Sequence, residues 1–268
     1  MNWLSYHVYP LETADVFLAR ALRPFLEKHV WPEKSARAFF VRYADDHGPH
    51  IRLRFRGEAE WLENTLQPTL FQHFENRGEL VAATYEPEPE RFGGPDALAW
   101  AEEYFHQSTR VVLERLNREQ YTYGDAMFDA LRLHVITAFA AGFDTKKTGW
   151  YFGQLCDQWL PLFFKPEEVA DGADWQGEVK AGFERQFAPQ RFPIVDALDR
   201  FWKDLKKGKI DKENPEWLRW LRANELILKG LGDDLEKALP SLLHLTNNRV
   251  GIQNADEVYL NYILGRAF

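Results

Sequence analysis

Apolar and polar positions alternate most regularly in the stretch GPHIRLRFRG, residues 48–57. Its apolar residues are interleaved with Arg52, Arg54 and Arg56, and such alternation is typical of a strand that buries one of its faces. The other face then carries three arginines in a row. The alternation by itself fits two interpretations, a solvated surface or a positive site for an anionic substrate.

The first 90 residues alternate between the periodicities of strands and helices. Strands are predicted at residues 2–9, 36–44, 50–56 and 80–86, and helices at 14–30 and 58–77. Thr13 is predicted as the N-cap of the first helix, and Pro24 is expected to kink that helix or end it early. The order β-α-β-β-α-β is typical of a ferredoxin-like unit.

This order assigns the two sides of the arginine strand. Both helices of such a unit cover one face of an antiparallel sheet, so the apolar residues of 50–56 should point toward them. Arg52, Arg54 and Arg56 are then expected on the open face, where later segments of the chain can pack over them.

The remainder of the chain is predicted to be helical. A loop rich in Pro and Gly at 86–96 precedes helical patterns at 96–117, 125–141, 146–164, 176–187, 194–206, 214–229, 232–246 and 255–265. The charged residues 203–214 are predicted to be a solvated connection. We therefore predict an α+β fold in a single domain at 1–268, with an α+β subdomain at 1–90 and a helical subdomain at 91–268.

Composition narrows the class of protein. Hydrophobic residues make up 45% of the 268 residues, which is enough to fill a substantial core. The single cysteine, Cys156, rules out an internal disulfide and fits a reducing compartment. No apolar run approaches a membrane span, and the N-terminus lacks the pattern of a signal peptide. We expect a cytoplasmic protein without a membrane partner.

Charge and short motifs exclude further classes. A net charge of −8 argues against direct binding to nucleic acid. The sequence contains neither CxxC nor HExxH, which argues against a metal site. It also contains neither GxGxxG nor GxxxxGKS/T, so no phosphate-binding loop is indicated. We expect neither a metal nor a cofactor.

Three stretches combine reactive residue types with turns or helix ends: HIRLR at 50–54, YEPEPERFGG at 85–94 and HLTNNRVGI at 244–252. Each also has an ordinary structural interpretation. Arginines on a strand are usually solvated. Arg91 can pair with the neighbouring glutamates, and a histidine in a helix is usually a hydrogen-bonded residue rather than a catalyst.

Taken together, these motifs resemble the C-terminal elimination domain of class I lantibiotic dehydratases, which also occurs in thiopeptide-type bacteriocin biosynthesis proteins. PHIRLRF, YEPEPERFGG and HLTNNRVGI follow the family's order and spacing, and the final EVYLNYILGRAF is similar to its C-terminal helix. AEEYFHQSTRVVL at 101–113 resembles the family's intervening helix, although the family often has an acidic residue at the position of Gln107. The resemblance spans nearly the whole chain.

The resemblance implies an activity. In full-length members a large N-terminal part transfers glutamate from glutamyl-tRNA to Ser or Thr of a precursor peptide. The C-terminal domain then eliminates glutamate to give dehydroalanine or dehydrobutyrine. For this chain the resemblance implies the second step, a carbon–oxygen lyase reaction on a precursor peptide, with a separate glutamyl-tRNA-dependent glutamylating protein as partner. Full-length members are often dimers, so a homodimer is a further option.

The resemblance also implies site residues. The motif match yields four catalytic candidates: Arg52, Arg54, Arg91 and His244. Three weaker candidates for substrate binding are Arg249, which matches a family arginine, Tyr85, and His50, which can equally be a turn residue. Arg56 lies outside the Arg-x-Arg motif and is expected to be a solvated strand end.

The chemistry of glutamate elimination suits these residue types. A base must remove the weakly acidic Cα proton, and an enolate-like oxygen and a glutamate carboxylate must be stabilised. Guanidinium groups bind such anions through paired N–H donors. Arg52 and Arg54 would lie about 7 Å apart on one side of a strand, a spacing that suits a glutamyl group and the reacting carbonyl. His244 is expected to abstract the Cα proton or to relay a proton to the departing glutamate.

Two other functions stay open. A pyridine synthase, which joins two dehydroalanines by a formal 4+2 cycloaddition in thiopeptide maturation, is a family relative that need not keep the complete Arg and His set. A non-catalytic subunit could instead capture the precursor peptide by strand addition. Retention of all four motif-matched residues favours elimination.

Overall fold

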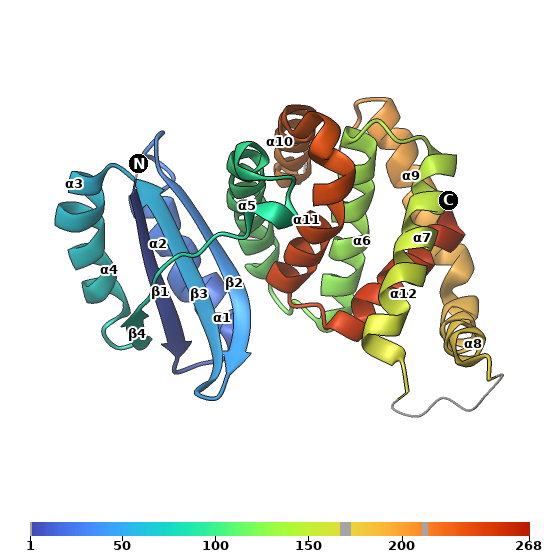
Figure 1. Ribbon diagram of the computed structural model, residues 1–268, viewed down its shortest axis with the longest axis horizontal. Coiled ribbons are helices and arrows are strands. Elements are labelled where there is room, and N and C mark those ends of the chain that lie inside the picture. The colour runs from blue at the N-terminus through green and yellow to red at the C-terminus, as the bar shows by residue number, and fades with distance from the viewer. Residues whose placement is uncertain (1, 167–172, 211–213) are drawn as a thin grey trace. The chain divides into compact units, whose positions relative to one another are not determined.

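The computed structural model describes residues 2–166, 173–210 and 214–268 (Figure 1). These residues form two compact units. The first takes the chain up to Thr122 together with Gly230–Gly251, and the second takes Tyr123–Lys229 with Ile252–Phe268. The single domain with a subdomain boundary at residue 90 stays a prediction, and the first compact unit combines the sheet with helices that follow residue 90.

The first unit is built on a four-stranded antiparallel sheet. Its strands are β1 Asn2–Pro10, β2 Arg37–Asp45, β3 Gly48–Gly57 and β4 Gly78–Ala82, in the spatial order β2-β3-β1-β4. One crossover helix joins β1 to β2 and another joins β3 to β4, which confirms the predicted β-α-β-β-α-β order. Because β4 ends at Ala82 rather than at residue 86, Tyr85 follows the strand instead of belonging to it.

Both crossover helices contain a turn of π-helix shortly before a proline. The first comprises α1 Ala14–Phe17, η1 Leu18–Leu22 and α2 Arg23–His29, and the second comprises α3 Ala59–Trp61, η2 Leu62–Leu66 and α4 Gln67–Phe74. Pro24 does not end the first helix, which continues to His29. Proline has no N–H to donate to the helix. In both helices it comes shortly after the π-helical turn, where the hydrogen bonds already differ from those of an α-helix. Thr13 occupies the predicted N-cap position without a side-chain capping bond.

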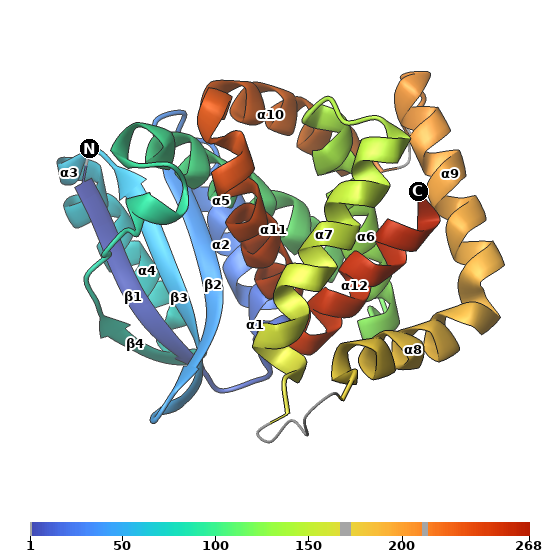
Figure 2. The ribbon, with the colours of Figure 1, turned by 45° about the vertical axis from the view of Figure 1, so that its right-hand side comes forward.

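The apolar face of the sheet packs against these crossover helices. Ile51, Leu53 and Phe55 are buried as predicted, and the Phe55 ring lies 6.2 Å from that of Phe25 on α2. Figure 2 shows the crossover helices behind the sheet. Full burial of a side chain of this size contributes about 2 kcal/mol. This core therefore determines which face of β3 presents the arginines.

Two later helices of the first unit, α5 Pro95–Leu116 and α11 Leu235–Val250, lie beside the edge strand β2 (Figure 1). From α5, His106 Nδ1 and Thr109 Oγ1 accept hydrogen bonds from backbone N–H groups of β2, at 3.1 and 3.4 Å. From α11, Asn248 accepts from the N–H of Arg42 and donates to its C=O, both at 2.9 Å. These side chains satisfy backbone groups that an edge strand otherwise exposes.

The second unit is helical. Its helices are α6 Tyr123–Ala140, α7 Thr145–Phe164, α8 Trp175–Phe187, α9 Arg191–Lys206, α10 Pro215–Leu231 and α12 Asn254–Ala267, with the last two residues of α10 in the first unit. Short 3₁₀ turns lie at η3 Pro89–Arg91, η4 Ala188–Gln190 and η5 Gly232–Asp234. Glycine favours the close packing of α7 on α12, since a Cβ on Gly265 would lie only 3.0 Å from the backbone N of Gly153.

The helices predicted after residue 95 are present, with changes at their ends. α11 continues to Val250 instead of ending at 246, so His244 and Arg249 share one helix. The predicted connection at 203–214 begins inside α9, which ends at Lys206, and its residues 211–213 lie outside the described ranges. Among the described residues, no helix combines the length and apolar character that a membrane span requires.

Candidate functional site

The strand register brings β1 and β3 together on the open face of the sheet. Residues of β1 stand opposite the three arginines in these pairs: Trp3 with Arg56, Ser5 with Arg54, and His7 with Arg52. In Figures 1 and 2 the segment after β4 passes in front of this face, opposite to the crossover helices. The three arginines therefore share one face of the sheet, as predicted, and the segment after β4 partly covers it. We call this side of the sheet, with Arg52, Arg54 and Arg56, the arginine face.

Arg54 is the most buried of the three arginines, with 7% of the residue exposed. Its Nη1 donates to the backbone oxygens of Tyr6 and Leu53, at 3.3 and 3.1 Å. Burial first, and then the neighbouring charge of Arg52, lower the pKa of Arg54 to about 10. Arg52 is more accessible, and its guanidinium carbon lies 3.3 Å from the ring centroid of Tyr43. Neither arginine has a carboxylate partner among the described residues.

Arg56 has a different environment. Its Nη1 donates to Oε2 of Glu102 on α5 at 2.9 Å, and the two side chains are 21% and 7% exposed. The expectation of a solvated strand end is therefore wrong. A helix 46 residues away in the sequence supplies the counter-charge, which the local alternation could not indicate.

Tyr85 covers the arginine face from the segment that follows β4. Its ring packs on Trp3 at 4.5 Å between centroids and lies 5.7 Å from Phe39. Its hydroxyl donates to Oε1 of Glu102 at 3.1 Å, and the Arg54 guanidinium carbon lies 5.9 Å from its ring centroid. Burial is the main cause that raises the pKa of both Tyr85 and Glu102. The phenol therefore stays protonated and can donate a hydrogen bond.

Arg249 on α11 is fully buried. Its Nη1 donates to the backbone oxygen of Leu245 at 3.0 Å, and its guanidinium carbon lies 5.0 Å from the Phe105 ring centroid and 5.8 Å from that of Phe39. Its Nε and Nη2 have no hydrogen-bond partner within the described ranges. Burial lowers its pKa to about 9, and the phenols of Tyr104 and Tyr85 oppose that shift. The residue is a buried cation with free donors.

The remaining motif residues lie in other surroundings. Arg91 ends the short turn η3, and its Nη1 donates to Glu88 at 2.7 Å with 43% of its side chain exposed. This ion pair with a neighbouring glutamate is the ordinary structural role that the sequence allowed for Arg91. His244 is partly buried on α11. Five residues separate it from Arg249, about 140° around the helix, so the two side chains leave α11 in different directions.

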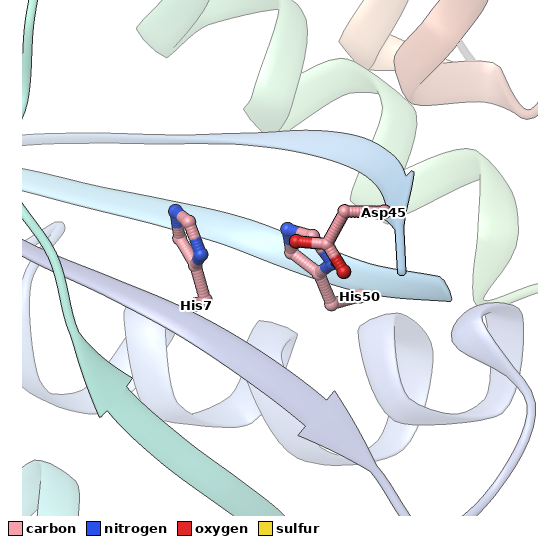
Figure 3. Close-up of side chains that lie close together, drawn as sticks. All are labelled: His7, Asp45 and His50. Atoms are coloured by element: carbon pink, nitrogen blue, oxygen red, sulfur yellow. The ribbon is translucent and has the colours of Figure 1, made fainter. Parts of the chain in front are cut away.

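His50 and His7 form a second group at the end of the arginine face (Figure 3). The His50 side chain is fully buried, with Nδ1 at 3.2 Å from the Gly48 oxygen and 3.8 Å from Oδ1 of Asp45. Its ring stacks on His7 at 4.7 Å and 26°. Burial, followed by the charges of His50, Arg54 and Arg52, lowers the pKa of His7.

The donor atoms of His7, Asp45 and His50 lie within 4.8 Å of one another, as in some metal sites. Their orientation does not suit a metal ion, however. A histidine coordinates through a lone pair in the plane of its ring, and two nearly parallel stacked rings do not direct these lone pairs at one point. The nearby Arg52 and Arg54 also oppose a cation. The absence of a metal site stays a prediction, and this geometry supports it.

Sequence reasoning missed Ser5, His7 and Glu102. Ser5 and His7 could have been found, because NWLSYHVY alternates and the ferredoxin-like order makes β1 the neighbour of β3. Glu102 could not, since its position depends on how α5 packs. The arginines, phenol and histidines of this face can together bind carboxylates and oxyanions.

The chain matches the family model of the lantibiotic biosynthesis dehydratase C-terminal part over residues 3–268. Among curated proteins, the subtilin biosynthesis protein SpaB of Bacillus subtilis is 33% identical over 116 residues, which are 41% of this chain and 11% of SpaB. This chain therefore spans a small part of that relative.

Solved structures share the fold. The tRNA dependent lantibiotic dehydratase MibB from Microbispora sp. 107891 has a TM-score of 0.62 and 20% identity, covering 99% of this chain and 27% of MibB. The pyridine synthase TbtD from thiomuracin biosynthesis has a TM-score of 0.77 and 14% identity, covering 100% of this chain and 97% of TbtD. TsrL has a TM-score of 0.67 and 17% identity over 93% of its length. The family match covers nearly every residue, and this chain belongs to the family formed by the C-terminal part of the lantibiotic biosynthesis dehydratases.

Proposed function

We propose that this chain eliminates glutamate from O-glutamylated Ser or Thr of a ribosomally made precursor peptide, which yields dehydroalanine or dehydrobutyrine. The observation that carries the proposal is the arginine face, where Arg52, Arg54 and Arg249 have no carboxylate partner among the described residues. Family membership supports a role in the maturation of such peptides. In this proposal a glutamyl-tRNA-dependent protein supplies the glutamylated peptide.

The reaction is a β-elimination that requires one base and stabilised anions. The base takes the Cα proton, the C–H electrons form the Cα=Cβ double bond, and the Cβ–O bond breaks as glutamate leaves as a carboxylate. We assign proton transfer to His244. We assign stabilisation of the developing enolate oxygen to Arg52, because a positioned donor in a water-poor site typically contributes about 3 kcal/mol to the transition state. Arg54 binds the glutamyl group, and Arg91 is the remaining motif-matched candidate.

A single assay tests this proposal. The purified chain is incubated with a peptide that carries a chemically glutamylated serine, and the products are followed by mass spectrometry. Loss of glutamic acid from the peptide is the expected result. An unchanged peptide at high enzyme concentration would refute elimination as the function of these 268 residues.

A second candidate function is that of a pyridine synthase. The supporting observation is that TbtD aligns with this chain over 97% of its own length and with the higher TM-score, although at 14% identity the likeness concerns the fold. Incubation with a peptide that contains two dehydroalanines distinguishes the two, since ring formation supports the synthase and loss of glutamate from the first peptide supports elimination. A protein that binds both peptides and converts neither is a non-catalytic subunit.

A further inference from the structure

Arg52 has two residues directly opposite it in the sheet. The strand register pairs it with His7 on β1 and with Val41 on β2. Opposite residues of an antiparallel pair point to the same face, with their Cβ atoms about 5 Å apart. Valine has no group that accepts a proton, whereas a neutral imidazole is a common general base near neutral pH. The strand pairing therefore places an imidazole beside Arg52 on the arginine face.

His7 combines a fixed ring with available nitrogen atoms. Its ring stacks on that of His50 at 4.7 Å between centroids and 26° between planes (Figure 3). The His50 side chain is 0% exposed, and its Nδ1 donates to the Gly48 oxygen at 3.2 Å. His7 itself is partly exposed, and no hydrogen bond within the described ranges engages its ring nitrogens. A substrate can therefore reach a ring whose plane is already set.

The charges around His7 favour its neutral form. From β3 it faces His50, Arg54 and Arg52, from the end of β2 it faces Asp45, and the residue opposite it on β4 is not titratable. Burial is the largest cause that lowers the pKa of His7 below its ordinary value of 6.5, followed by the three groups of β3. Asp45 opposes this shift. His7 is therefore uncharged at neutral pH, as a base must be.

Elimination requires the base and the donor to the enolate oxygen to be neighbours. The Cα that loses the proton is bonded directly to the carbonyl carbon, so both groups must reach adjacent atoms of one residue. Each of them must also come within hydrogen-bonding reach of its target. Because the enolate oxygen is assigned to Arg52, the base is expected next to that side chain. His7 meets this condition through the register of β1 and β3.

We propose that His7 is a further catalytic residue, the base that accepts the Cα proton of the glutamylated residue beside Arg52. This inference rests on the proposed elimination. The proton moves from Cα to a ring nitrogen of His7, and the C–H electron pair forms the Cα=Cβ bond. The Cβ–O bond breaks, and its electrons leave with the glutamate carboxylate. The imidazolium of His7 then releases its proton to solvent. The proton transfer assigned to His244 is donation to the departing glutamate.

The alternative is a structural role in which His7 only covers the buried ring of His50. A structural ring can be replaced by any ring of the same shape, whereas a base can be replaced only by another base. Free imidazole and pyrazole make this distinction, because both are flat five-membered rings and pyrazole is a far weaker base. His7→Ala removes the imidazole and leaves room for either molecule at a partly exposed position.

The experiment measures kcat/KM for a peptide that carries a glutamylated serine. His7→Ala and His7→Gln should each lower the rate about 100-fold, because a general base typically contributes a factor of this size. Added imidazole should raise the rate of His7→Ala about 10-fold, and pyrazole should leave it unchanged. A loss that imidazole does not restore, or that pyrazole restores equally, overturns the inference.

The matched control is His47→Ala, which removes an exposed histidine from the same end of the sheet and should retain the wild-type rate. Circular dichroism verifies the folding of each variant, and if His7→Ala does not fold, the rate of His7→Gln decides. Elimination at the wild-type rate by a folded variant of His7 overturns the assignment of the base and leaves the proposed elimination standing.

A second measurement decides if the wild type leaves the glutamylated peptide intact. In D₂O, mass spectrometry then follows the exchange of the Cα hydrogen for deuterium in a peptide with an amide in place of the ester. Exchange by the wild type that is lost in His7→Gln retains His7 as the base and refutes elimination. A wild type that neither eliminates nor exchanges refutes both.

Discussion

The Arg56–Glu102 pair leads to a quantitative prediction on stability. Arg56→Met removes the guanidinium but leaves the Glu102 carboxylate, whose side chain is 7% exposed, with the Tyr85 hydroxyl as its remaining donor. Loss of one partner from a fully buried pair costs about 3–5 kcal/mol, and loss from an exposed pair costs under about 1 kcal/mol. Because Arg56 itself is 21% exposed and water can partly replace it, we expect a loss of about 2 kcal/mol at neutral pH.

The pH dependence of this loss has a definite sign. Burial raises the pKa of Glu102 above its ordinary value of 4.5, and Arg56 is the largest cause that opposes the shift. A carboxyl group with a raised pKa in the folded protein is most favourable to folding when protonated, so its contribution is present at low pH and is lost as pH rises through the folded pKa. Arg56→Met raises that pKa further and should destabilise more at pH 7.5 than at pH 5.

Urea unfolding monitored by circular dichroism at both pH values measures this effect. The double variant Arg56→Met/Glu102→Gln is the control, because the glutamine amide carries no charge and its oxygen can still accept from Tyr85. It should recover more than half of the stability lost at pH 7.5. A loss below 0.5 kcal/mol in the single variant, an equal loss at both pH values, or no recovery in the double variant would refute this account of the pair.

Three further predictions concern other parts of the first unit. His244→Ala should slow elimination about 100-fold or more, so that the glutamylated peptide accumulates in mass spectra, whereas the exposed His47→Ala should retain the wild-type rate. Phe55→Ala should lower the free energy of unfolding by about 3–4 kcal/mol, since the residue is fully buried, and a loss below 1 kcal/mol in urea titration would contradict the core described above. Gly251→Ala should cost about 1 kcal/mol in the same assay, because φ is +96° and the new Cβ would lie 3.3 Å from Arg42 Cζ.

The topology of the sheet could be predicted because its signals are local. Alternation in β1 and β3, helical spacing between the strands and turn residues at 45–49 are each readable within about ten residues. The covering of the β2 edge could not be read in this way. His106, Thr109 and Asn248 carry no mark of their hydrogen bonds to β2, because those bonds depend on the packing of α5 and α11.

The candidate site shows the same division between local and distant information. The alternation of GPHIRLRFRG placed Arg52, Arg54 and Arg56 on one face, but it could not rank them. The family resemblance added Arg249 and Tyr85, and the structure brings both of their side chains near Phe39 on the arginine face. Arg56 was misjudged because its partner, Glu102, lies on α5.

The three arginines of β3 acquire different roles from the counter-charge around them rather than from the strand itself. Arg56 is neutralised by Glu102, Arg52 lies on the ring of Tyr43, and Arg54 is buried against backbone oxygens. The chain has 41 acidic residues against 33 basic ones, so acidic side chains for pairing are plentiful. That Arg54 and the fully buried Arg249 still have no carboxylate among the described residues is therefore a local property of this face. A carboxylate or oxyanion of a substrate would supply the counter-charge that Arg54 and Arg249 lack. Arg56 already has its counter-charge in Glu102, so the same anion would bind there more weakly.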